Sequence, residues 1–181
     1  IAAPTGTVSV FGTITANGEG AMSTHGAGGS GGGISITCKR FDGSAAGLLS
    51  ATGGGGNLNG APGGGGRIAV VYDPATQAGY NPRVRLVTTR GLTVFISAVG
   101  RANEDGTVYL SDRSFLSSTM TGGLLQDSYL YIAGMTNWAG DSLTMDNCRW
   151  TFAQTGMVVT ITNGLTILTN GALGLMGNSV L

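Results

Sequence analysis

The chain has 181 residues, enough for one ordinary domain, and 34 of them are glycine. Charged residues make up only 10% and hydrophobic residues 41%, which excludes a disordered linker, because disorder requires low hydrophobicity and high charge. The absence of a Gly-X-Y period excludes collagen. A helical bundle is excluded because each glycine destabilises a helix by about 1 kcal/mol relative to alanine. We therefore expect a β-dominated protein with almost no helix.

The charges and cysteines narrow the classes of partner. Nine basic and nine acidic residues give no net charge, and no basic cluster is dense enough to favour nucleic acid. The sequence contains no run of about 18 apolar residues, so it predicts no membrane-spanning helix. A single histidine and the lack of a CxxC pair predict neither a metal site nor a cofactor. The two cysteines, Cys38 and Cys148, are compatible with one disulfide or with two buried thiols.

The first half of the chain contains a repeat of about 35 residues. Two units, 12–46 and 47–73 onward, share the order strand, glycine tract, strand, with a single one-residue gap between them. Repeated units of this kind are expected to stack in register. The residues expected to form equivalent inward pairs are Ile14 with Leu49 and Ile34 with Ile68.

The glycine tracts allow two interpretations. They carry no charge between Asp42 and Arg67 and few side chains that could build a core. They are either flexible loops or extended, polyproline-II-like segments. In the second case, the glycines let neighbouring backbones lie side by side.

The second half predicts a series of short strands. We expect the first four strands at residues 83–88, 92–98, 107–110 and 128–133. Apolar segments then begin near residues 142, 149, 157, 165 and 172, seven to eight residues apart. The pairs Asn163-Gly164 and Asn170-Gly171 indicate turns between them. Such turns fit antiparallel hairpins, or a solenoid with three strands and about 22 residues per coil.

Together these patterns predict an all-β fold, a parallel β-helix (β-solenoid) with glycine-rich insertions. The glycine-rich β-repeat region is expected at 1–73, and a β-solenoid region at 74–181 that continues beyond the last residue. Because no charge occurs from Trp150 to Leu181, we expect this end to be covered. The expected cover is further coils of the same polypeptide or identical subunits in a fibre or homo-oligomer. The start at Ile1 rather than Met indicates a processed product or an excised piece.

Two stretches resemble known families. Thr-Ile-Thr-Ala-Asn-Gly, the glycine tract and Gly-Gly-Gly-Gly-Arg-Ile-Ala-Val-Val-Tyr resemble glycine-rich blocks of very large bacterial surface proteins. The tail, Val-Thr-Ile-Thr-Asn-Gly-Leu-Thr-Ile-Leu-Thr-Asn-Gly-Ala-Leu, is similar to right-handed parallel β-helices of the autotransporter and pectin-lyase-like type. The resemblance covers residues 7–73 and 141–181 and rests on composition and rhythm. It implies an extracellular or cell-surface setting and a scaffold or adhesive role, and it transfers no catalytic residue.

Two features of the first glycine tract could suggest a functional site, but neither supports one. Gly26, Gly28 and Gly31 fit the dinucleotide-binding spacing, but a strand rather than a helix is expected to follow them. His25 would have to serve any Ser–His–Asp triad, and a glycine tract is a poor place to hold a general base. We expect His25 to be a solvent-exposed loop residue.

The strongest catalytic candidate is a cluster of Asp127, Asp141, Asp146 and Arg149. Pectin-lyase-like enzymes combine carboxylates, often with calcium, and an arginine near the abstracted proton, so the cluster implies a polysaccharide lyase or hydrolase. Asp141 and Asp146 are five positions apart, however, so on one uninterrupted strand they would face opposite sides. We therefore favour solvated turn carboxylates with a structural salt bridge, and no catalytic residue.

A third class is a glycan-binding module that uses Tyr129, Tyr131 and Trp138. Exposed rings would favour this class and buried rings would favour core packing, which we expect. The leading hypothesis is a non-catalytic structural or adhesive segment of a secreted bacterial protein, with an enzyme and a glycan-binding module as alternatives. Its expected partners are its own coils or copies and, in the third case, extracellular glycans.

Overall fold

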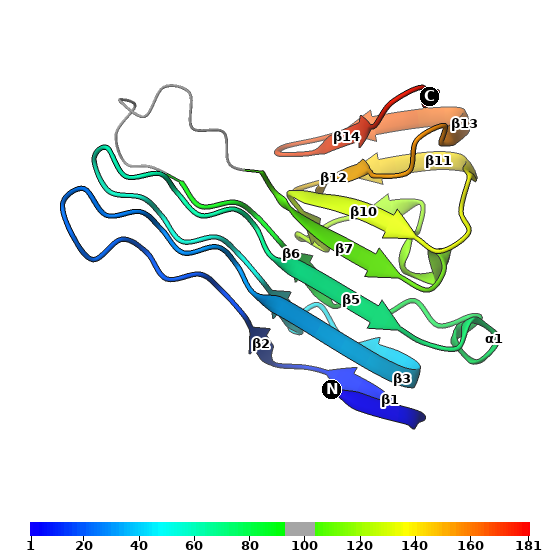
Figure 1. Ribbon diagram of the computed structural model, residues 1–181. Coiled ribbons are helices and arrows are strands. Elements are labelled where there is room, and N and C mark those ends of the chain that lie inside the picture. The colour runs from blue at the N-terminus through cyan, green and yellow to red at the C-terminus, as the bar shows by residue number, and fades with distance from the viewer. Residues whose placement is uncertain (93–103) are drawn as a thin grey trace.

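The computed structural model describes residues 1–92 and 104–181 (Figure 1). Strands dominate these residues. Their helices are one four-residue α-helix, α1 (Pro74–Gln77), and one three-residue 3-10 helix, η1 (Arg113–Phe115). The expectation of a β-dominated protein with almost no helix is confirmed. Residues 93–98 of the strand expected at 92–98 lie outside the described part of the chain.

The strands form three parallel sheets, of seven, four and three strands. The seven-stranded sheet comprises β1 (Ala2–Val10), β3 (Gly33–Gly43), β5 (Arg67–Val71), β7 (Gly106–Leu110), β10 (Ser128–Ile132), β12 (Arg149–Phe152) and β14 (Ala172–Leu175), in that order. The four-stranded sheet comprises β2 (Thr13–Thr15), β4 (Leu48–Ser50), β6 (Arg85–Val87) and β9 (Leu125–Gln126). The three-stranded sheet comprises β8 (Thr119–Met120), β11 (Asn137–Met145) and β13 (Val158–Ile167), with β11 in the middle. Strands from both 1–73 and 74–181 share the largest sheet.

The expected β-solenoid is wrong, because the strands of the described residues are arranged as three parallel sheets of unequal strand number. The four-stranded sheet ends at β9, and the three-stranded sheet begins only at β8. The seven- to eight-residue spacing of apolar segments misled the prediction. The segments near residues 157 and 165 belong to one ten-residue strand, β13.

The two turn signals near the C-terminus have different outcomes. Asn170 lies in a turn with a φ of 55°, as predicted. Asn163-Gly164 lies inside β13, where the pairing with β11 shifts register between Gly140 and Ser142. The Asn-Gly pair there marks an irregularity within a strand, and not a turn between strands.

The repeat in the first half stacks in register. Ile14 pairs with Leu49 between β2 and β4, and Ile34 pairs with Ile68 between β3 and β5. Both expected pairs are confirmed. Parallel pairing in register places equivalent side chains on the same face of a sheet, so the repeat builds continuous apolar rows.

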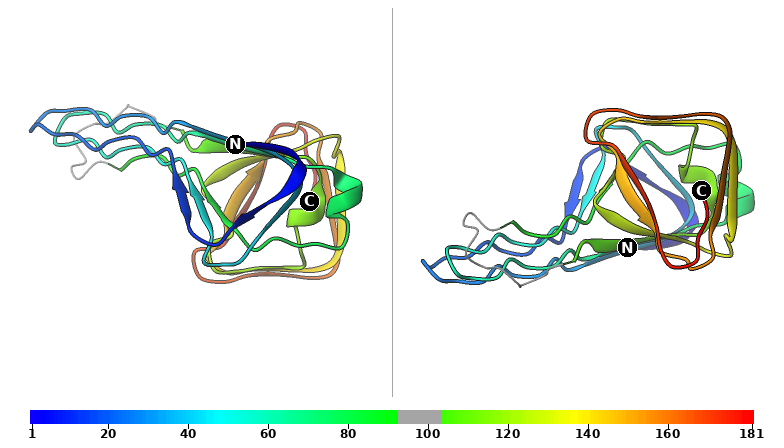
Figure 2. Two further views of the ribbon diagram at one scale, coloured as in Figure 1. Left: turned by 90° about the horizontal axis from the view of Figure 1, so that it is seen from below. Right: turned by 90° about the horizontal axis from the view of Figure 1, so that it is seen from above.

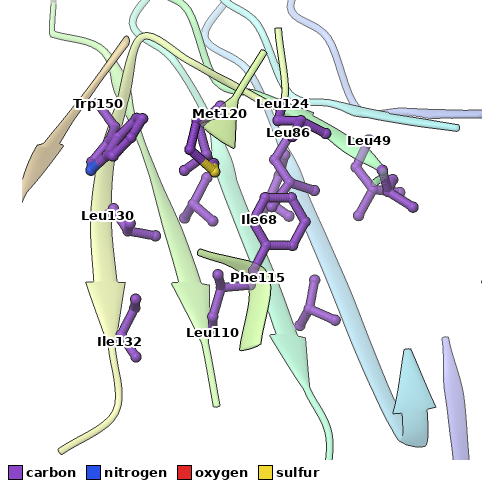
Figure 3. Packing of buried hydrophobic residues seen from close by; sticks show 14 of the residues in the cluster. Leu49, Ile68, Leu86, Leu110, Phe115, Met120, Leu124, Leu130, Ile132 and Trp150 are labelled. Carbon is purple, nitrogen blue, oxygen red and sulfur yellow. The ribbon is translucent and has the colours of Figure 1, made fainter. Parts of the chain in front are cut away.

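The core lies between the inner faces of the sheets. Along β3 buried and exposed residues alternate, and Ile34, Ile36 and Cys38 point inward. Figure 3 shows side chains from several strands, among them Ile68, Leu110 and Leu130, that meet in this core together with Phe115 of η1. Cys38 and Cys148 are both buried free thiols, so the disulfide alternative is wrong.

The glycine tracts project from the sheets as an arm (Figures 1 and 2). We define the glycine arm as residues 16–32, 51–66 and 88–92. Between its parallel segments Gly18 N donates to Thr52 O at 2.7 Å, and Ala21 N donates to Gly55 O at 2.8 Å. These two hydrogen bonds are thus three residues apart on both segments, which is the period of the polyproline II conformation.

Antiparallel segments of the glycine arm follow the same rule. Gly54 N donates to Gly29 O at 2.8 Å, and Asn57 N donates to Gly26 O at 3.1 Å. The arm is therefore a bundle of extended chains joined by backbone hydrogen bonds. This confirms the interpretation of close-packed backbone over that of flexible loops.

Close packing explains why the arm needs glycine. A Cβ atom on Gly28 would lie 2.0 Å from the carbonyl oxygen of Gly54, and one on Gly60 would lie 1.9 Å from that of Gly26. Neither obstacle is a movable side chain. The arm can thus contain few other residues at these positions.

Candidate functional site

Three tyrosines project from the outer face of the seven-stranded sheet. In β7 and β10 the apolar residues Val108, Leu110, Leu130 and Ile132 are buried, so the alternate residues point outward. These are Tyr109, Tyr129 and Tyr131, which we call the tyrosine face. Tyr109 and Tyr131 are directly paired across the two strands.

The paired rings stack against each other. Tyr109 and Tyr131 are stacked, with ring centroids 5.7 Å apart and planes 13° from parallel. Tyr131 is 44% exposed. Stacking on Tyr109 restricts the Tyr131 ring and leaves its opposite face, on the β12 side, uncovered by Tyr109.

Small residues lie beside the tyrosine face on β12 and β14. A Cβ atom on Gly174 would lie 2.3 Å from Thr151 Oγ1, so the Thr151 side chain occupies the space that a side chain at position 174 would need. A hollow of about 240 Å³ at the start of β10 and β12 is lined by Tyr129, Thr151 and Gly174 among others. A second hollow of about 360 Å³ at the far end of these strands is lined by Tyr131 and Ala153 among others.

An ion pair closes one end of the first hollow. Arg149 contacts Asp127 with two nitrogens, Nε to Oδ1 and Nη2 to Oδ2, both at 2.6 Å. Thr89 Oγ1 also donates to Asp127 Oδ2 at 3.0 Å. Both carboxylate oxygens of Asp127 are thus engaged, and bidentate pairs of this kind are the strong ones. Asp127 serves as an anchor for Arg149 and not as a free base.

A second polar contact involves Tyr129. Its hydroxyl donates to Glu104 Oε2 at 2.9 Å. This hydrogen bond raises the pKa of Tyr129, because the neutral phenol is the donor, and partial burial acts in the same direction. Asp105, which also lines the first hollow, accepts from Arg90 N at 3.0 Å.

The other two predicted carboxylates lie elsewhere. Asp141 is exposed on β11, where it accepts hydrogen bonds from Thr162 and Asn163 of β13. Asp146 directly follows β11. Among the residues that the structure describes, no hydrogen bond or ion pair joins either one to Asp127 or Arg149. β11 belongs to the three-stranded sheet and Arg149 begins a strand of the seven-stranded one, so only Asp127 and Arg149 come together.

The predicted aromatic contacts also separate. Trp138 is 7% exposed and packs with its ring centroid 6.3 Å from that of Phe152, whereas Tyr131 is exposed and Tyr129 is half-buried. The prediction did not include Tyr109, Thr151 and Gly174. The alternation Val-Tyr-Leu at 108–110, which matches Leu-Tyr-Ile at 130–132, could have indicated Tyr109.

Within residues 1–92 and 104–181, no three histidines, cysteines or acidic residues gather closely enough to hold a metal ion. The same residues include no helix long and apolar enough to cross a membrane. No protein-family model, curated protein or solved structure matches the chain. The resemblance to glycine-rich bacterial surface proteins therefore stays a prediction.

Proposed function

We propose that the protein is a non-catalytic structural and adhesive segment of a secreted or cell-surface bacterial protein, and that it acts as an extended scaffold. The observation that carries this proposal is the glycine arm. Its hydrogen bonds run between backbones every three residues, so it forms a stiff projection with few functional side chains. Such an element suits display and mechanical contact.

The arrangement of the acidic residues supports the same conclusion. A lyase or hydrolase needs an acid and a base that converge on one bond of the substrate. Among the described residues neither Asp141 nor Asp146 pairs with Arg149, and both oxygens of Asp127 are bound by Arg149 and Thr89. The ion pair is therefore a structural one.

An assay with two readouts tests the proposal. The chain is coupled to beads and passed under flow over glass coated with cellulose, mannan, starch, chitin or polygalacturonate. The soluble chain is also incubated with each polysaccharide, and new reducing ends and unsaturated uronides are measured. We expect bead retention on at least one coating and no product on any. Asp127→Asn is included because any cleavage that uses the Asp127 carboxylate would be lost in this variant.

Two results would overturn the proposal. One is product formation that Asp127→Asn abolishes, which would indicate an enzyme. The other is bead retention that, on every polysaccharide coating, is no stronger than the retention of albumin-coated beads. Retention without product supports the scaffold.

A further inference from the structure

The tyrosine face and the two hollows beside it follow one line along β10 and β12. Tyr129 lines the first hollow and Tyr131 lines the second, two residues further along the same strand. At about 3.3 Å per residue, their Cα atoms are about 7 Å apart. The two hollows are thus spaced along the strand direction, with an aromatic residue at each, which suits a chain molecule.

We propose that this surface binds a neutral oligosaccharide, laid along β10 and β12 with sugar rings against Tyr129 and Tyr131. The inference rests on the adhesive part of the proposed function and assigns its ligand class. A pyranose ring presents C–H groups on its faces and hydroxyl groups at its rim. It therefore needs a flat apolar platform with polar groups beside it. Tyr131 stacks on Tyr109 through one ring face, so its opposite face, on the β12 side, provides that platform.

Polar groups beside the platform match the rim of the ring. Arg149 retains 46% side-chain exposure despite its ion pair, and its guanidinium has donors beyond the two that contact Asp127. Thr151 offers a hydroxyl on β12, beside Gly174 of β14, where it lines the first hollow. Each can exchange hydrogen bonds with sugar hydroxyls, and a few such groups fix the orientation of a ligand.

The charges select an uncharged chain. Arg149 and Asp127 neutralise each other, whereas Glu104 and Asp105 together outweigh the single positive charge of Arg90 near Tyr129. An anionic polysaccharide would meet like charge there, which opposes binding. Neutral hexose chains avoid this repulsion.

Calorimetric titration of the purified chain tests the inference. The probes are cellohexaose, mannohexaose, maltohexaose and chitohexaose, with polygalacturonate as the anionic comparison. We expect at least one neutral hexamer to bind more tightly than polygalacturonate. Tyr131→Ala should weaken that affinity about tenfold, and Tyr131→Phe, which keeps the ring, should retain it. Tyr80→Ala is the matched control, because Tyr80 is a comparably exposed tyrosine, 47%, outside the tyrosine face.

The inference is wrong if no neutral hexamer binds at millimolar concentration, or if Tyr131→Ala and Tyr80→Ala change the affinity equally. It is also wrong if polygalacturonate binds most tightly. Bead retention that survives Tyr131→Ala would overturn this ligand assignment alone, because the scaffold would then adhere through another surface. Loss of retention in that variant, with unchanged thermal unfolding, supports the inference.

Discussion

Gln77 shows how one polar side chain completes the seven-stranded sheet. β5 ends at Val71 opposite Thr37, so further along β3 Phe41 has no strand neighbour on that side. Gln77, which is fully buried, fills the gap: its Oε1 accepts from Phe41 N at 2.9 Å and its Nε2 donates to Phe41 O at 3.0 Å. α1 places the side chain there, and Asp73 caps α1 by accepting from Ala75 N.

Gln77→Met should lower the free energy of unfolding by about 2–3 kcal/mol, because it leaves both backbone groups of Phe41 buried without partners. Urea unfolding followed by fluorescence measures the change. Gln126→Met is the control, since the amide of Gln126 makes exposed hydrogen bonds to Asn147; its effect should stay within about 0.5 kcal/mol. Equal effects of the two substitutions would contradict the role assigned to Gln77.

The two thiols should be unreactive in the folded protein. Cys38 and Cys148 are buried and free, and burial raises the pKa of Cys38. A higher pKa means less thiolate at a given pH, so the reaction with an aromatic disulfide reagent should remain slow through the pH range where free cysteine ionises. Unfolding in guanidinium should release two reactive thiols per chain. Fewer than two without reductant would indicate a disulfide.

At the scale of elements, the sequence predicted the strands of the repeat and their register, because apolar residues alternate with period two and the units align. It did not predict β13 as one strand. Asn163-Gly164 is a turn signal on local chemistry, but pairing with β11 keeps the chain extended through it. Tertiary pairing thus overrode a local preference, as it commonly does for strands. The expected burial of the aromatic rings was right for Trp138, which packs against Phe152, and wrong for Tyr131, which alternates with the buried Leu130 and Ile132 and is therefore exposed.

Two glycines of the glycine arm, Gly28 and Gly20, should respond differently to substitution by alanine. A Cβ atom on Gly28 would lie 2.0 Å from Gly54 O, whereas one on Gly20 would lie no closer than 3.8 Å to Gly55 O. Gly28→Ala should therefore force the segments apart and raise the amide hydrogen-exchange rate of Gly54 at least about fivefold, as overpacking of about 1–3 kcal/mol would do. Gly20→Ala should leave that rate within about twofold. Similar rates in both variants would contradict close packing.

At the scale of the whole molecule, an apolar surface lies on β13 and β14 and the residues directly after them. Leu165, Ile167, Leu168 and Met176 are all more than one third exposed there. Composition revealed the apolar tract and the all-β class. It did not reveal that three sheets share one core, because the number of sheets depends on how long each strand continues, and distant pairing decides that.

This surface should associate at high protein concentration, because large exposed apolar patches favour contacts between molecules and zero net charge offers no repulsion. Light scattering should give a mass above 18.1 kDa that rises with concentration. Ile167→Lys should reduce the rise, whereas Val71→Lys, a similarly exposed site on β5, should not. A mass that stays at the monomer value at every concentration would refute this.

The composition of the glycine arm also has a thermodynamic consequence. Exposure of apolar surface raises the heat capacity on unfolding, and exposure of peptide groups lowers it. The arm buries mainly peptide groups, whereas the sheets bury aliphatic and aromatic side chains. Opening the arm should thus show little or negative change in heat capacity. Cooling weakens hydrophobic burial but not this backbone network, so near the freezing point of water the arm should hold its shape at least as firmly as at room temperature.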